Sequence, residues 1–162
     1  MHSLRLLVCV ALLVAAGCEA VPPPGSGSPA ADEPIVFTPD SDVLAPFVAV
    51  AAARWAAATG LDIRVGDGGI PWVLVDRLPT GTGTESLGAT AADRSEVLIH
   101  VRGKYAWPRT VLHEMGHALW GDHVDSMGVL SYHDGYEPII DTASLESVCE
   151  RLPCAAFSPE AP

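Results

Sequence analysis

Residues 41–59 carry apolar side chains at the three- and four-residue spacing of an amphipathic helix. The segment is rich in alanine, Pro46 lies near its start, where a missing N–H does little harm, and Gly60 follows its end. Short runs of Val, Ile and Leu between turn residues predict four strands. They are residues 61–65, 72–75, 87–90 and 96–101. We expect residues 87–90 to lie at the edge of the sheet.

Two more helices are predicted downstream. Pro108 can open the first, whose apolar residues recur at helical spacing: Val111, Leu112, Met115, Ala118 and Leu119. The second covers residues 144–152, after Asp141. This order of elements predicts an α/β (α+β) fold with a twisted mixed sheet, a long backing helix and a C-terminal helix.

Residues 1–17 have the pattern of an export signal. A short positive segment precedes the unbroken apolar run Leu6–Ala16, and small residues follow. A run of about 11 apolar residues covers only half of a ~30 Å hydrocarbon core as a helix. We therefore interpret residues 1–17 as a signal peptide rather than a membrane anchor.

The signal ends in Val14-Ala15-Ala16-Gly17-Cys18, which resembles the lipobox of bacterial lipoproteins. In that family the cysteine becomes the lipidated first residue, although Ala15 stands where leucine is commonest. The resemblance implies an exported bacterial protein held at the membrane of the cell envelope through lipid on Cys18. Simple cleavage near Ala20, which would give a secreted protein, is the alternative.

Residues 18–34 are rich in Pro, Gly, Ser and Ala and have no apolar face. Such a composition buries too little surface to fold, so we interpret the segment as a flexible tether behind Cys18. The folded domain is expected over residues 35–162, which is long enough for one core.

The chain has 162 residues, of which 49% are hydrophobic, and a net charge of -11. These values predict one globular domain, which we expect to be a monomer. Lysine and arginine together number only nine. Because so few basic residues give no basic surface for a phosphate backbone, we do not expect the protein to bind nucleic acid.

Two cysteines remain in the folded domain if Cys9 leaves with the signal and Cys18 carries lipid. They are Cys149 and Cys154. Thiols oxidise in exported proteins, so we predict a disulfide between them.

The candidate chemistry lies on the helix that Pro108 opens, in the sequence His113-Glu114-Met115-Gly116-His117. Residues four apart in a helix share one face, so the two imidazoles can bind the same ion. Zinc accepts imidazole nitrogen, and catalytic zinc sites combine three protein ligands with one open position. The sequence therefore predicts a Zn²⁺ site beside Glu114.

The third ligand must follow the end of this helix, because a straight helix would carry it to the opposite side. We expect Gly121 to adopt the left-handed conformation that turns the chain back. His123 is the preferred third ligand, and Asp122 and Asp125 are the alternatives. Two other histidines are interpreted as ordinary residues: His100 and His133.

These residues resemble the signature of the metzincin zinc endopeptidases, H-E-x-x-H-x-x-G-x-x-H. Glu114 matches the catalytic glutamate of that family. Three histidines match its metal ligands: His113, His117 and His123. The glycine of the signature would fall at position 120, where this chain has Trp120 and then Gly121. Either the helix runs one residue longer or Trp120 takes a costly conformation.

The same family has a turn below the metal, built on a methionine that is often followed two residues later by a tyrosine. Val129-Leu130-Ser131-Tyr132 resembles this turn, with Leu130 in place of methionine at similar volume. Met127 offers the alternative alignment. Tyr132 would then ligate zinc or donate a hydrogen bond to the oxyanion, and a half-buried turn tyrosine is the alternative.

The resemblance implies a small zinc endopeptidase domain with an active-site helix. Glu114 would act as general base toward a metal-activated water. A peptide or protein substrate would lie along the edge strand at residues 87–90. Two alternatives share this metal site. One is a non-catalytic zinc- or partner-binding surface lipoprotein, and the other is a zinc hydrolase of cell-wall peptides.

Overall fold

The computed structural model of the protein describes residues 33–79, 87–103, 106–131 and 138–155. The predicted signal peptide, Cys18 and nearly all of the tether lie outside the described residues, as do Tyr132 and His133. Within the described residues, no helix has both the length and the apolar character needed to cross a membrane.

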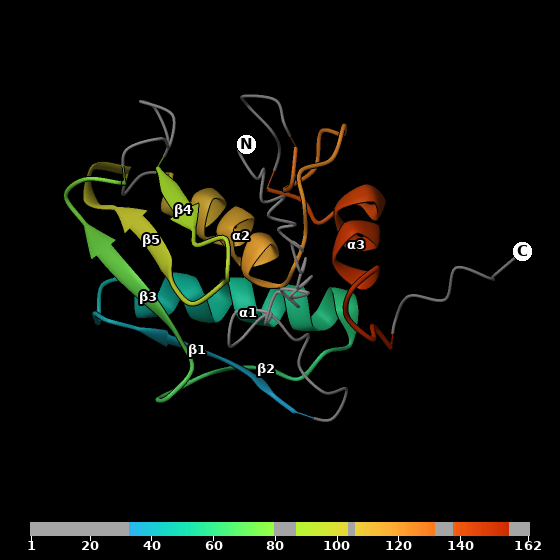
Figure 1. The fold of residues 1–162 in the computed structure, drawn as a ribbon, viewed down its shortest axis with the longest axis horizontal. Coiled ribbons are helices and arrows are strands. Elements are labelled where there is room, and N and C mark those ends of the chain that lie inside the picture. The colour runs from blue at the N-terminus through green and yellow to red at the C-terminus, as the bar shows by residue number, and fades with distance from the viewer. Residues whose placement is uncertain (1–32, 80–86, 104–105, 132–137, 156–162) are drawn as a thin grey trace, which may run out of the picture.

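Five strands form one mixed sheet (Figure 1). Across the sheet their order is β2 (Ile63–Val65), β1 (Ile35–Pro39), β3 (Ile70–Val75), β5 (Val97–His100) and β4 (Gly88–Thr90). The first four run parallel to one another, whereas β4 is antiparallel to β5 and lies at the edge. The predicted α+β class, mixed sheet and edge strand are confirmed.

The central position of β1 was not predicted. This strand pairs with both β2 and β3, and it buries Ile35 and Phe37 against the helices. Its apolar run has only three residues, Ile35-Val36-Phe37, and directly follows the Pro-rich tether. The strand is therefore stabilised by pairing and burial, which a short local pattern does not reveal.

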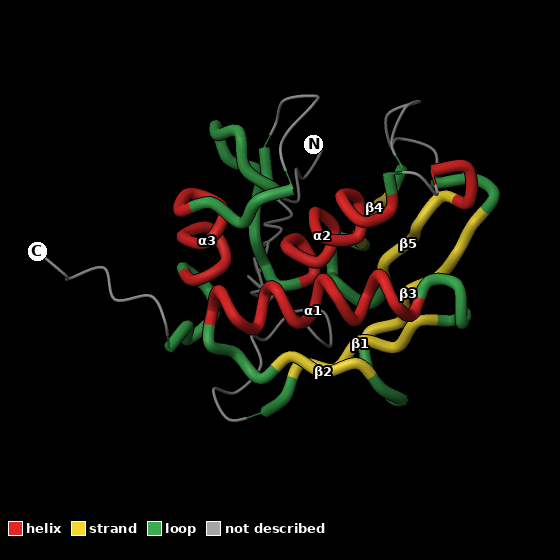
Figure 2. Tube along the Cα trace, turned by 180° about the vertical axis from the view of Figure 1, so that it is seen from behind, coloured by secondary structure: helices red, strands yellow, loops and turns green. Residues whose placement is uncertain are grey.

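Three α-helices and one short 3₁₀ helix complete the fold. They are α1 (Ala45–Thr59), η1 (Val101–Gly103), α2 (Trp107–Ala118) and α3 (Thr142–Cys149). In both views of the fold, α1 lies between strands β1 and β2 on one side and helices α2 and α3 on the other (Figures 1 and 2). Helix α1 contacts β1 and β2, and α2 contacts β4 and β5. The predicted long backing helix is thus confirmed.

The long helix begins later than predicted, at Ala45 instead of residue 41. The backbone carbonyl of Ser41 accepts hydrogen bonds from the amides of Leu44 (3.1 Å) and Ala45 (3.0 Å), which closes a turn before the helix. Gly60 ends the helix in the left-handed conformation, with φ 73°. The predicted end of this helix is therefore confirmed.

The C-terminal helix is shifted by a few residues from its predicted range. Asp141 caps it, because its carboxylate accepts a hydrogen bond from the amide of Ser144 at 2.9 Å. The helix ends at Cys149, and Cys149 forms the predicted disulfide with Cys154.

Two aromatic contacts fix α2 on the long helix. The indole N–H of Trp55, a fully buried residue of α1, donates to the carbonyl of Leu112 at 2.9 Å. Phe47 and Trp107 meet edge to face, with ring centroids 5.6 Å apart. Since α1 also packs on the sheet, these contacts set the position of α2 relative to the strands.

Candidate metal centre

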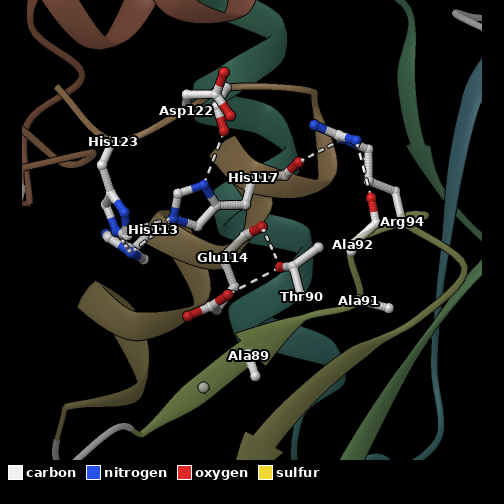
Figure 3. Close-up of a pocket in the computed structure, with 12 residues that line it drawn as sticks. Ala89, Thr90, Ala91, Ala92, Arg94, His113, Glu114, His117, Asp122 and His123 are labelled. Atoms are coloured by element: carbon white, nitrogen blue, oxygen red, sulfur yellow. Dashed lines mark hydrogen bonds between the residues drawn. The ribbon is translucent and has the colours of Figure 1, made fainter. Parts of the chain in front are cut away.

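Helix α2 presents His113 and His117 on one face, as their spacing predicts. The opposite face is buried in the core through Val111, Leu112 and Met115. Burial of that apolar face fixes the rotation of the helix, so the two imidazoles must point away from the core. The chain after the helix turns back and brings His123 beside them (Figure 3).

The Nε2 atoms of the three histidines converge. They are 3.0 Å apart between His113 and His117, 3.2 Å between His117 and His123, and 3.3 Å between His113 and His123. Donors bound tetrahedrally at about 2.1 Å to one zinc ion lie about 3.4 Å apart. The cluster therefore has close to the spacing that a single ion of this size requires.

Backbone carbonyls fix the tautomers of the two helical histidines. Nδ1 of His113 donates to the carbonyl of Val129 at 2.6 Å, and Nδ1 of His117 donates to that of Gly121 at 2.8 Å. A carbonyl only accepts, so each Nδ1 carries the proton and each neutral ring turns an unprotonated Nε2 inward. Two lone pairs at 3.0 Å make no hydrogen bond to each other. A metal cation fits this donor set.

Burial keeps these rings neutral. It lowers the pKa of His113 to about 3, with a further contribution from neighbouring His117. Burial also lowers the pKa of His117 and that of His123, although His123 is the more exposed of the three. Neutral imidazole is the form that ligates metals. The three histidines can therefore hold a metal ion.

A Schellman turn ends α2 and brings His123 to the cluster. The amide of Trp120 donates to the carbonyl of His117 at 3.0 Å, and the amide of Gly121 donates to that of Gly116 at 2.9 Å. Trp120 occupies the left-handed position of this motif, with φ 65°. The expectation that Gly121 would be left-handed is wrong.

The left-handed conformation costs a residue with a Cβ about 1–2 kcal/mol, which is why glycine is usual there. Two hypotheses were given for the displaced glycine, a longer helix or a costly conformation of Trp120. The structure has the second, because Trp120 has a positive φ and the helix ends at Ala118. Gly121 has another role. A Cβ at this position would lie 2.6 Å from Cδ1 of Leu130 and 2.9 Å from the carbonyl oxygen of Gly116. The chain passes too close to the helix end for any side chain.

Glu114 lies between the histidines and the edge strand. It is only 6% exposed, and burial raises its pKa to about 7, while hydrogen bonds from Thr90 oppose this shift. The Thr90 hydroxyl lies 2.9 Å from Oε2 of Glu114 and 3.1 Å from its backbone carbonyl (Figure 3). A Cβ at Gly88 would lie 2.7 Å from Cγ of Glu114. The strand thus leaves room for the carboxylate and binds one of its oxygens.

The three histidines and Glu114 line a cavity of about 550 Å³ whose other wall is the edge strand and the loop after it. That wall has small side chains, Ala89, Ala91 and Ala92, and ends at Arg94. Figure 3 shows the strand running past Glu114 toward this loop. The cavity is therefore bordered by both β4 and the three histidines.

The structure also separates the alternatives for the other predicted residues. Leu130 is fully buried beside Gly116 and Gly121, whereas Met127 is 60% exposed, so of the two residues only Leu130 packs in the core. Asp122 forms an ion pair with Arg151, with 3.0 Å between Oδ2 and Nη2, and neither Asp122 nor Asp125 belongs to the histidine cluster. Tyr132 lies outside the described residues.

Two residues of this cavity were not predicted as functional: Thr90 and Arg94. Thr90 could have been suspected, because it lies on the predicted edge strand beside the expected substrate. Arg94 gives no comparable signal, since only the tertiary fold brings its loop to the end of α2. Comparison with protein-family models and with curated proteins finds no match for this chain.

We expect the full chain to bind one equivalent of a divalent metal ion. His117→Ala should weaken this binding by at least about 100-fold, because it removes one of the three imidazoles. His100→Ala is the matched control. His100 accepts a hydrogen bond from the Arg102 amide at 3.0 Å and is not part of the cluster. Competitive titration against a chromophoric chelator measures both affinities. Equal losses in the two variants would contradict the site.

Proposed function

We propose that this protein is a zinc-dependent endopeptidase. One observation carries the proposal: a cluster of three neutral imidazoles and a buried carboxylate open into the same cavity beside a sheet edge. Among the described strands, β4 has a partner only on its β5 side. The resemblance of residues 113–123 to the metzincin signature supports the same reaction.

Zinc is the proposed ion because the donors are three imidazole nitrogens, held by His113, His117 and His123. When bound there, zinc supplies Lewis acidity toward the scissile carbonyl and toward water. Val129 and Gly121 hold two of the rings through their carbonyls and set the direction of the ligand lone pairs.

Glu114 is the proposed general base. Thr90 holds Oε2, which leaves Oε1 to take a proton from the attacking water. Transfer of that proton to the amine nitrogen completes cleavage of the peptide bond and returns Glu114 to its starting state. Oε1 lies beside Gly88, because a Cβ at that position would be 2.9 Å from it.

The proposed substrate is a peptide segment in extended conformation. It would add main-chain hydrogen bonds to the outer edge of β4 (Gly88–Thr90). The side chains at positions 89, 91 and 92, which line the cavity beside this edge, are those of alanine and are therefore small. Such binding recognises the peptide backbone, which is the same along the whole substrate chain, so it suits an enzyme that cleaves within the chain.

Glu114→Gln is expected to retain metal and to lower kcat for a quenched peptide by at least about 1,000-fold, because the amide cannot accept the proton. The control is Glu146→Gln, the same change at an exposed position on α3. Full activity in the Glu114 variant would rule out its role as base. Metal binding without cleavage in the unaltered chain would favour the non-catalytic alternative.

Thr90→Val is expected to lower kcat about 10-fold with little change in KM, because the carboxylate loses the hydrogen bond that aims it. Thr90→Ser keeps a hydroxyl and should retain most of the activity. Steady-state kinetics on one peptide measures both constants. If the valine and serine variants lost activity equally, packing of the methyl group rather than the hydroxyl would be responsible.

We also propose that the protein is exported and carries lipid on Cys18. The disulfide between Cys149 and Cys154 supports an oxidising compartment. Cys18→Ala should abolish incorporation of labelled palmitate in bacteria and release the protein from the membrane fraction. Cys9→Ala, within the signal, should leave labelling unchanged. Labelling that survives Cys18→Ala would refute the lipid site.

A further inference from the structure

We propose that Arg94 is a positioning residue that holds Trp120 in the left-handed conformation and thereby places His123 at the metal centre. The inference rests on the metal site of the proposed function, but it does not depend on peptide cleavage. It assigns a reason for the tryptophan that replaces the glycine of the signature.

The problem that Arg94 solves is local to the end of α2. Trp120 has φ 65°, although its Cβ disfavours this region. If Trp120 adopted a right-handed conformation, the chain would continue past the helix end and His123 would leave the cluster. A contact outside the turn can offset this cost.

The guanidinium of Arg94 provides contacts at both ends of this turn. Its Nε donates to the carbonyl of His117 at 3.2 Å, and its Cζ lies 5.3 Å from the centroid of the Trp120 ring (Figure 3 shows the first of these contacts). The carbonyl of His117 also accepts the amide of Trp120, so the three groups form one unit. A cation stacked on an indole is stabilising in this geometry.

Arg94 is itself held in place. Its Nη1 donates to the carbonyl of Ala92 at 3.2 Å, and its amide donates to the carbonyl of Ala91 at 2.8 Å within the turn that links β4 to β5. Arg94 also has a positive φ of 60°. The loop from the edge strand thus delivers a fixed cation to the tryptophan ring.

Charge alone predicts the opposite effect on metal binding. Arg94 is a cation beside a site for a dication, so its removal should tighten binding if electrostatic repulsion dominates. Removal should weaken binding if Arg94 acts through the turn. The sign of the change therefore discriminates between the two roles.

The test compares four full chains: the unaltered protein, Arg94→Ala, Trp120→Gly and the double variant. Zinc affinity is measured by chelator competition, and the visible spectrum of bound Co²⁺ reports whether three imidazoles ligate. We expect Arg94→Ala to weaken zinc binding about 10-fold and to alter the Co²⁺ spectrum. Trp120→Gly should bind within about 3-fold of the unaltered chain, since glycine adopts positive φ without support.

The double variant decides the mechanism. Because glycine makes the stack unnecessary, it should bind zinc like Trp120→Gly and thus rescue Arg94→Ala. The inference is overturned if Arg94→Ala binds zinc as tightly as the unaltered chain or more tightly. It is also overturned if the double variant remains as weak as Arg94→Ala.

Two further variants complete the design. Arg151→Ala removes a neighbouring cation that pairs with Asp122, whereas the cation over the Trp120 ring is Arg94, so this change should not weaken binding. Arg94→Lys retains the charge but not the planar group, so it should also weaken zinc binding, and Trp120→Gly should rescue it. This variant provides the same test if Arg94→Ala fails to fold. Zinc binding without peptide cleavage would refute the endopeptidase and leave this inference intact.

Discussion

The reversal of the chain after α2 is the constraint on which the convergence of the three histidines depends. Two of them lie on the helix and the third lies only six residues after the second, so no continuation of the helix can bring all three together. The Schellman turn reverses the chain, because it ends the helix at Ala118, with Leu119 as the C-cap, and directs His123 toward the other two rings. The backbone carbonyl of Gly121, freed by the same turn, then orients His117.

The opposite wall of the cavity depends on how α2 packs against the edge strand. Gly88 allows the strand to approach the helix closely enough for Thr90 to reach Glu114. The contact of Trp55 with Leu112 sets the height of α2 above the sheet, since α1 packs on both. The carboxylate is therefore positioned by the strand and the imidazoles by the helix and its turn. Core packing joins these two halves of the site.

The sequence predicted what local spacing determines. The shared face of His113 and His117 follows from the helix period, and the end of α1 follows from Gly60. Strand β1 was missed because its stability comes from pairing with β2 and β3. The left-handed residue was assigned to Gly121 because glycine is the usual choice, whereas the contact that favours Trp120 comes from a distant loop.

Gly121 connects the two departures from the metzincin pattern, because Trp120 directly precedes it and Leu130 packs against it. Leu130 is branched where the turn of that family has an unbranched methionine, and Cβ atoms at Gly116 and Gly121 would each lie 2.6 Å from one of its two methyl groups. Glycine is thus needed at 121 to admit Leu130, not to provide a positive φ. The left-handed position one residue earlier is then free to carry a side chain, provided that another group stabilises it. A tryptophan stacked on Arg94 meets that requirement, so the displaced glycine is compatible with the convergence of the three histidines.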